Sequence, residues 1–386
     1  MKLDGIRVLD LSRFLPGPWI SMTMADHGAE VIKVEGASGE PTRHIGPPIN
    51  GHTAYFRNTQ RGKRSIVLDL KSDEGREVFL KLAESSDVVI DSFRPGVVDR
   101  LGIGYDAVRA RVPGIVYCSL SAFGQDGAYR LRPSHDLGAE GLAGILSLTR
   151  EKGGKPAMPT LPVADIACAS NALIAILMAL LRREQTGAGD FIDAGMVDAL
   201  MAWTPHIISP VLAENRAPEP STERLYGGAA FYDRYRTADG EYIVLAGSEM
   251  NFVKNLLDAL GRADLIELCR EAPGESQAPV HDFLAETFLT KSRDEWDAWL
   301  ADKDVCYAPV LNMQEAWQQP YLREREMVLE GEDGIEHLGT PVKFREEPGN
   351  PVSTVPELGA DTEALLTELG YDEGARRRMR ESGACG

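Results

Sequence analysis

The stretch that decides the fold runs from residue 7 to residue 34 and reads RVLDLSRFLPGPWISMTMADHGAEVIKV. Arg7–Leu11 and Glu30–Val34 are short runs rich in β-branched residues, which is typical of buried strands. Between them lies a loop with Pro and Gly, followed by a helical pattern over Pro18–Gly28. A strand, a helix and a second strand indicate a crossover unit, in which the two strands are parallel.

The same alternation continues to about residue 120. It predicts further strands at Ser65–Leu70, Asp87–Asp91 and Gly114–Leu120, and helices at Ser72–Ala83, Gly96–Leu101 and Tyr105–Arg111. Strands separated by helices predict an α/β fold with a parallel, Rossmann-like sheet. The glycine fingerprint GxGxxG is missing, since the chain reads SRFLPGPW after the first strand. We therefore expect the sheet to bind something other than NAD.

The chain from 133 to 200 has a helical pattern, with a long helix predicted over Ile166–Arg183 and a second from Met196 onward. The Pro- and Glu-rich segment Ser209–Arg224 is typical of a linker. Strands at Ala229–Arg236 and Glu241–Ala246, joined by the turn TADG, predict a hairpin. Helices are expected from there to about residue 320, and an extended segment at 339–349.

Composition limits the possible partners. The 386 residues carry 41 Lys and Arg against 59 Asp and Glu, a formal net charge of −18. A surface so acidic repels phosphate backbones and anionic membranes, so nucleic acid is not expected as a partner. The most apolar run, 172–181, is about half of the roughly 20 residues that span a bilayer, and we expect it to be a buried helix.

The five cysteines are scattered and form no CxxC or His/Cys cluster. Neither a disulfide framework nor a metal site is expected from such a pattern. The N-terminal segment lacks the long apolar region of a signal peptide. A reducing, cytoplasmic location fits these features best.

Two residues with suitable chemistry stand at predicted helix starts. His135 and its neighbours Ser134 and Asp136 open the segment SHDLGAEGLAG, where unpaired backbone N–H groups suit an anion or an enolate oxygen. Asp165 lies between apolar residues and a long apolar helix, so burial makes it a stronger base for proton abstraction or a nucleophile. Simple helix capping is the alternative for Ser134, Asp136 and Asp165, and a surface position is the alternative for His135.

Glu249 follows the second hairpin strand at a loop-to-helix junction, where a first-turn helix acid is the plain alternative to a functional role. The most basic segment carries Arg57, Arg61, Lys63, Arg64 and Lys71, and Arg94 and Arg100 follow it. Such a concentration in an acidic protein could hold a phosphate-bearing ligand, or it could be a loop of solvated charges.

Several motifs in order resemble the family III CoA-transferase (CaiB/BaiF) superfamily, which includes CoA-transferases and α-methylacyl-CoA racemase. The resemblance runs over nearly the whole chain and rests on the following segments: GIRVLDLSRFLPGPWISMTMADHGAEVIKVE, RGKRSIVLDLK, FRPGVVDRLGIGYD, YCSLSAFGQDG, SHDLGAEGLAG, VADIACASNALIAILMALLRREQTGAGDFIDAGMVDAL and GGAAFYDRYRTADGEYIVLAGSEMNF.

The resemblance implies a large Rossmann-like domain made of residues 1–200 and 331–386. It implies a linker over 201–224 and a smaller α+β domain over 225–330. Two such chains would interlock into a homodimer.

The resemblance also implies two possible reactions. In the transferases the aspartate at the position of Asp165 attacks an acyl-CoA thioester, and CoA passes through an aspartyl-CoA thioester to a free carboxylate. In the racemase that aspartate and a histidine at the position of His135 exchange the α-proton on opposite faces of the carbon. Glu249 would orient His135. A non-catalytic acyl-CoA-binding protein is a third class, against which the retained Asp165 argues.

His135–Asp136, Glu249 and the short Gly227–Gly228 run resemble the racemase branch, so we expect a racemase first and a transferase second. Departures from the racemase pattern are Ser134, Met250 and Gly36. No cofactor is expected beyond CoA as part of the substrate. The resemblance implies CoA contacts at Leu68, Asp69, Leu70, Lys71, Phe93, Arg94, Arg100, Ser134, Asp136 and Leu137.

Overall fold

A computed structural model describes residues 1–386, which divide into two compact units. Unit 1 comprises 1–143, 160–203 and 320–386, and unit 2 comprises 144–159 and 204–319. These boundaries differ from the expected domains in two segments. Residues 144–159 group with unit 2, where Arg150 pairs with Glu219 and Glu151 pairs with Arg234. Residues 320–330 group with unit 1.

Unit 1 is built on a six-stranded sheet with the order β5-β2-β1-β6-β7-β8. Every neighbouring pair in it is parallel. The Rossmann-like sheet predicted from sequence is thus confirmed, with the strand order 3-2-1-4-5-6 of dinucleotide-binding folds. The strands are β1 (Arg7–Asp10), β2 (Glu30–Glu35), β5 (Lys63–Val67), β6 (Val88–Asp91), β7 (Val116–Ser121) and β8 (Asp190–Gly195).

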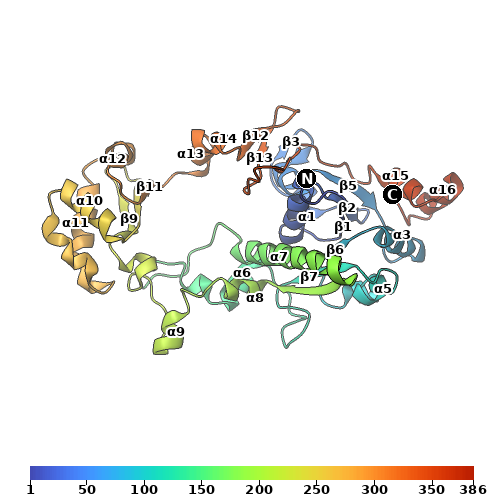
Figure 1. The fold of residues 1–386 in the computed structure, drawn as a ribbon, viewed down its shortest axis with the longest axis horizontal. Helices are drawn as coiled ribbons and strands as arrows, with labels where there is room; N and C mark the ends of the chain where they lie inside the picture. Colours follow the sequence, from blue (N-terminus) through green and yellow to red (C-terminus); the bar gives the residue numbers. More distant parts are fainter. The chain divides into compact units, whose positions relative to one another are not determined.

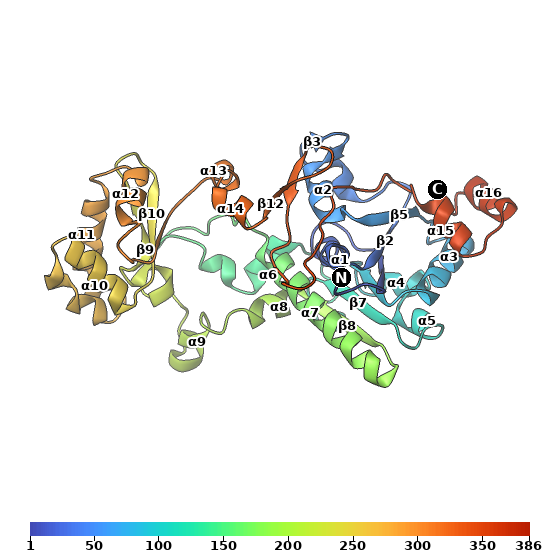
Figure 2. The ribbon, with the colours of Figure 1, turned by 45° about the horizontal axis from the view of Figure 1, so that its top comes forward.

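Helices cover both faces of this sheet (Figures 1 and 2). Helix α1 (Pro16–Asp26) and helix α7 (Val163–Thr186) pack on one face and against each other, and α3 (Asp73–Glu84) and α5 (Tyr105–Arg109) lie on the other. The remaining elements of unit 1 are β3 (Pro48–Ile49), β4 (His52–Thr53), α2 (Ala54–Gln60), α4 (Val97–Arg100), α6 (Asp136–Leu142), α8 (Met196–Ala202), α14 (Pro320–Glu324), β12 (Val328–Glu330), β13 (Glu336–Leu338), α15 (Thr362–Glu368) and α16 (Glu373–Glu381).

Two parts of unit 1 depart from the sequence pattern. Strand β8 interrupts the region from 133 to 200 that was expected to be helical, because DFIDAG pairs with β7 although its first residue, Asp190, is exposed. Residues near the C-terminus also return to the sheet: Asp361 accepts a hydrogen bond from the backbone N–H of Ser65 at 2.9 Å, and α15 packs on β5.

Unit 2 is built around the predicted hairpin. Strands β9 (Tyr232–Arg236) and β10 (Tyr242–Ala246) are antiparallel, and β11 (Tyr307–Pro309) adds a third strand. Their buried face packs on Trp296, Phe288 and other apolar residues of the surrounding helices. The expected linker contains a short helix, α9. The helices of unit 2 are α9 (Ser209–Glu214), α10 (Met250–Ala259), α11 (Ala278–Phe288), α12 (Arg293–Leu300) and α13 (Met313–Trp317).

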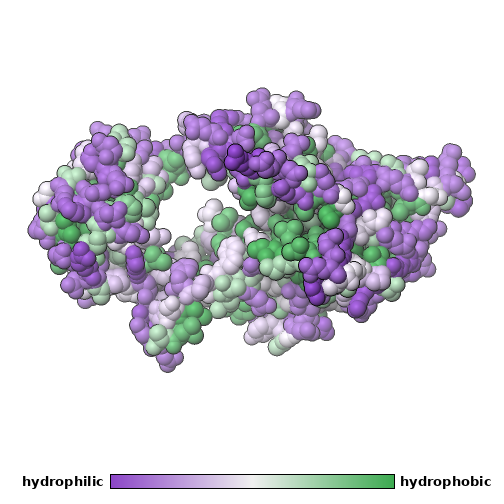
Figure 3. Space-filling view, viewed as in Figure 1, coloured by the Kyte–Doolittle hydropathy of each residue, from purple (hydrophilic) through white to green (hydrophobic).

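Helix α7 confirms the predicted long helix but is less buried than expected. Its Gly187 cap adopts φ 70°, a left-handed conformation that glycine favours. Ile176 and Leu180 are buried, whereas Met178 and Leu181 on the opposite side are exposed, and Figure 3 shows apolar residues gathered over this helix. By length and composition α7 could cross a membrane, which is weak evidence because core helices of soluble proteins pass the same test.

A buried charge cluster supports the carboxyl end of β1. Asp10 is fully buried, and its carboxylate accepts from Lys33 Nζ at 3.3 Å and from Lys63 Nζ at 3.0 Å. Burial would raise the pKa of Asp10, but the two lysines and the hydroxyls of Ser12 and Ser21 outweigh it and hold that pKa well below its ordinary value. Asp10, Lys33 and Lys63 belong to β1, β2 and β5, so the cluster connects these three strands.

Asp10→Asn should lower the free energy of unfolding by about 3–5 kcal/mol, because it removes the carboxylate that two buried ammonium groups share and leaves only Glu40, 3.7 Å from Lys33, as a nearby counter-charge. Chemical denaturation of this variant beside the wild type measures the change. Glu346→Gln, at an exposed position of the same unit, is the matched control and should stay within about 0.5 kcal/mol. A change for Asp10→Asn as small as that of the control would contradict the role assigned to the cluster.

Candidate active site

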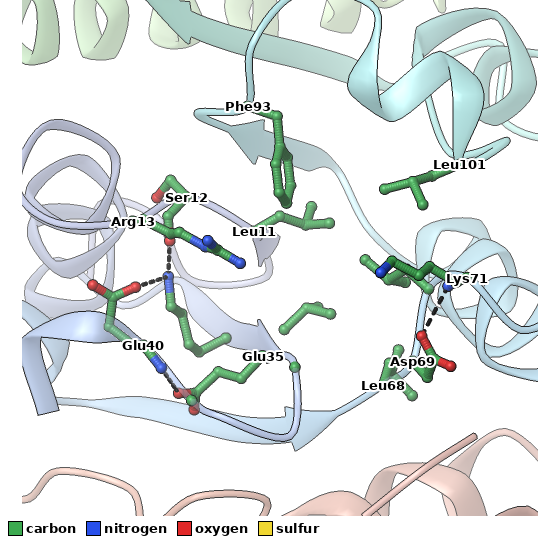
Figure 4. Close-up of a pocket in the computed structure, with 15 residues that line it drawn as sticks. Leu11, Ser12, Arg13, Glu35, Glu40, Leu68, Asp69, Lys71, Phe93 and Leu101 are labelled. Carbon is green, nitrogen blue, oxygen red and sulfur yellow. Dashed lines mark hydrogen bonds and ion pairs between the residues drawn. The ribbon is translucent and has the colours of Figure 1, made fainter. Parts of the chain in front are cut away.

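A first cavity, of about 190 Å³, opens at the carboxyl ends of β1, β2 and β5. Ligands of open parallel sheets bind at this edge, where the strand order reverses. Arg13 and Lys71 extend into the cavity from opposite sides, and Phe93 points towards Leu11 between them (Figure 4). Leu68, Asp69 and Leu70 also line it, so the predicted VLDLK segment lies at this cavity.

A second cavity, of about 500 Å³, shares Arg13 and Phe93 with the first. It is lined by the segments that follow β1, β6 and β7, including Arg94. His135 and Asp165, although 30 residues apart in sequence, line it together, with Ser134 beside them. The structure therefore brings the two principal candidate residues to one space.

Asp165 lies in the first turn of α7 and is not the helix cap. The cap position is Pro162, which has no side chain that could accept a hydrogen bond. Asp136 takes over this role from α6: its Oδ1 accepts from the backbone N–H of Ala164 at 2.8 Å and of Asp165 at 3.1 Å. Burial and the negative charge of Asp136 raise the pKa of Asp165 to about 7.

His135 precedes α6 and is solvent-exposed, which agrees with the surface position considered as an alternative in the sequence analysis. It nevertheless lines the second cavity. Its ring meets the Phe14 ring edge to face at 5.7 Å. Phe14 adopts φ 63°, an uncommon backbone conformation for a bulky residue, and its N–H donates to the buried Glu40 at 2.8 Å. Such local strain is typical of functional sites.

Positive charge gathers around the second cavity. Four arginines line it, and none of them forms an ion pair with a carboxylate: Arg13, Arg94, Arg130 and Arg132. Arg13 lies over the Phe93 ring and Arg132 over the Tyr129 ring. In a chain with a net charge of −18, unpaired arginines at one cavity provide a local site for an anionic group.

The basic segment chosen from sequence serves mainly a structural purpose. Arg57 pairs with Asp333, Arg61 with Asp26 and Lys63 with Asp10, and Arg64 pairs with Glu30, Asp361 and Glu368. These side chains are used inside unit 1, and of this group only Lys71 lines a cavity. Neither alternative, a phosphate site or a solvated loop, describes them, because their carboxylate partners come from distant parts of the sequence.

Three residues predicted to contact CoA line neither cavity. Arg100 and Leu137 are exposed, and Asp136 holds the start of α7. Glu249 lies in unit 2 at the cap position of α10, where its side chain makes no capping hydrogen bond and is exposed. Its predicted partnership with His135 stays a prediction.

Sequence reasoning missed several residues of this site. Tyr55 on α2 lies close enough to Asp165 that burial and the charges of Asp165 and Glu40 raise the pKa of Tyr55 to about 12. Phe14 and the arginines of the 123–133 loop were also missed. The RLRPSHD run, in which two arginines come just before His135, was a signal that could have found Arg130 and Arg132.

Comparisons with known proteins agree with this geometry. CoA-transferase family III matches residues 3–362. A succinyl-CoA:mesaconate CoA-transferase of Haloarcula marismortui is 31% identical over 97% of this chain and 98% of its own. The alpha-methylacyl-CoA racemase of Homo sapiens is 32% identical over 96% of this chain and 94% of its own.

A crystal structure of a CaiB/BaiF family protein from Brucella suis is similar with a TM-score of 0.84 and 32% identity, over 95% of this chain and 99% of that one. Its likeness to the fold described above covers both units. The chain therefore belongs to CoA-transferase family III, the CaiB/BaiF family, and is an enzyme of the group that holds CoA-transferases and an acyl-CoA racemase.

Proposed function

We propose that the protein is an acyl-CoA racemase or epimerase that inverts the α-carbon of a 2-methylacyl-CoA. The observation that carries the proposal is that His135 and Asp165 line one cavity of about 500 Å³. Inversion needs a base on one face of the carbon and a proton donor on the other. Two ionisable groups from separate segments, facing a common space, can supply both.

The reaction proceeds through an enolate. One of the two groups takes the α-proton, the electron pair of the broken C–H bond moves onto the thioester oxygen, and the other group returns a proton to the opposite face. The pKa of about 7 at Asp165 favours this reaction, since a group that titrates near the working pH both accepts and donates protons efficiently. The arginines of the second cavity would stabilise the enolate charge.

The CoA part of the substrate is proposed to occupy the first cavity. Arg13 and Lys71 enter it and would bind phosphate oxygens by charge-assisted hydrogen bonds. Leu68, Leu70 and Phe93 offer apolar contacts to the rest of the carrier. Because Arg13 and Phe93 line both cavities, a ligand that fills the first can reach Asp165 in the second.

A CoA-transferase is the second candidate. Here the Asp165 carboxylate attacks the thioester carbonyl, CoA thiolate leaves, and a mixed anhydride forms. The thiolate then attacks the aspartyl carbonyl and releases the first acid. A new carboxylate attacks the resulting aspartyl-CoA thioester and displaces the thiolate, which attacks the new acyl carbonyl and frees the Asp165 carboxylate. The four unpaired arginines favour this reading, because they could hold a free carboxylate, and a relative is named a succinyl-CoA:mesaconate CoA-transferase.

The two reactions differ in what happens in D₂O. With a 2-methylacyl-CoA alone we expect deuterium to enter the α-position, measured by mass spectrometry and NMR, because a racemase exchanges this proton with solvent. His135→Ala should slow the exchange by about 10²–10⁴-fold. A new CoA ester formed only when succinate is added, without any deuterium uptake, would establish the transferase and remove the racemase from consideration.

The rate should also depend on pH in a defined direction. In the half-reaction that Asp165 starts, its carboxylate must be ionised, so kcat/KM should fall as the pH drops through about 7. Exchange rates measured from about pH 5 to 9 in constant ionic strength test this. An acid limb near the ordinary carboxyl pKa of about 4 would contradict the proposed environment of Asp165.

We further propose that the active form is the interlocked homodimer that the family resemblance implies. The exposed apolar side of α7, with Met178 and Leu181, supports an assembly that would cover it. Light scattering coupled to gel filtration should give a mass of about twice 42.2 kDa. A monomer over the whole concentration range would refute this assembly.

A further inference from the structure

Glu140 is a buried acid that the proposed mechanism does not use. It lies on α6 one turn after Asp136, and only 1% of its surface is exposed. Its Oε1 atom has no hydrogen-bond partner. Charged carboxylates are rarely buried in this way without a cation, because the loss of hydration costs several kcal/mol. Glu140 therefore requires a physical explanation.

The position of Glu140 links it to the start of α7. Residues four apart lie on the same face of a helix, so Asp136 and Glu140 both face the neighbouring helix end. Asp136 accepts hydrogen bonds from the backbone N–H groups of Ala164 and Asp165, and the carboxyl group of Glu140 lies near the backbone N–H of Val163. Two carboxyl groups of α6 thus lie at the first turn of α7, at which Pro162 offers no cap.

Two ionised carboxylates at neighbouring positions of one helix face repel each other, so ionisation of both Asp136 and Glu140 is unfavourable. Burial, a hydrogen bond with Asp136 and the charge of Asp136 raise the pKa of Glu140 to about 7. No positive charge offsets this: α7 contributes Asp165, α8 contributes the exposed Asp198, and the exposed His135 precedes α6. A hydrogen bond between two carboxyl groups needs one proton, and the more buried partner is the one that keeps it.

We propose that Glu140 is a positioning residue for Asp165: in its neutral form it donates a hydrogen bond to Asp136 and so holds the Asp136 carboxyl group on the first N–H groups of α7. Asp136 then fixes the backbone of Asp165 and supplies the like charge that sets how readily Asp165 gains a proton. This inference rests on the proposed role of Asp165, which is the reacting group in both candidate reactions.

Two variants separate a neutral donor from a charged acid. Glu140→Gln keeps the size and an N–H donor for Asp136, so we expect kcat/KM within about threefold of the wild type and an unmoved acid limb of its pH profile. Glu140→Leu keeps the volume but removes the donor. Asp136 should then lose this hydrogen bond and its fixed place on the first N–H groups of α7, and the acid limb should move by about half a unit or more, with at least about a tenfold loss of kcat.

Outcomes of two kinds overturn the proposal. If Glu140→Gln moves the acid limb as Glu140→Leu does, Glu140 is ionised in the native protein. If Glu140→Leu loses only thermal stability and leaves the profile unmoved, its role is structural alone. The pH profile is recorded with whichever reaction, racemase or transferase, the D₂O experiment establishes. If the racemase proposal fails, the role of Glu140 can therefore still be tested in the transferase reaction.

Infrared spectroscopy keeps the test independent of activity and of the folding of the leucine variant. Between about pH 6 and 7 the spectrum of the wild type minus that of Glu140→Gln should show the C=O stretch of a protonated, buried carboxyl group, because the protonated Asp91 and Asp165 are present in both proteins and cancel. A difference spectrum without this band would overturn the assignment of the proton to Glu140.

Discussion

The parallel direction of the six strands is the constraint on which the rest of unit 1 depends. Because all strands run the same way, the segments that follow β1, β2, β5, β6 and β7 meet at one edge of the sheet. Both cavities are lined by these segments. The buried Asp10, held between Lys33 and Lys63, supports that edge from below. Residues far apart in sequence become neighbours there.

Asp165 depends on a second tertiary interaction, the capping of α7 by a different helix. A helix that begins at Pro162 has no local acceptor for its first N–H groups, and α6 provides one in Asp136. The same contact places the negative charge of Asp136 near Asp165, so the residue that caps α7 also raises the pKa of Asp165. Acids placed at helix starts are usually stabilised in their charged form, but burial and the neighbouring acid reverse that trend here.

Charge is distributed unevenly in this acidic chain. The arginines and lysines of the 57–64 segment are neutralised by carboxylates within unit 1, whereas the four arginines that line the second cavity are not. A cation that already has a buried carboxylate partner gains little from an incoming phosphate. Unpaired arginines such as Arg94 and Arg130 are therefore better candidates for substrate contacts than the more obvious basic cluster.

The sequence by itself determined the βαβ pattern, the hairpin and the choice of His135 and Asp165, which both line the second cavity. Period, turn residues and motif order are local properties, and local properties can be read from one chain. Tertiary structure alone decided the rest. Strand β8 was not predicted because its first residue is exposed. Asp136 caps a helix other than its own, and Arg61 pairs with Asp26, which is 35 residues away in sequence. Burial and charge pairing arise between distant segments, so no local pattern reports them.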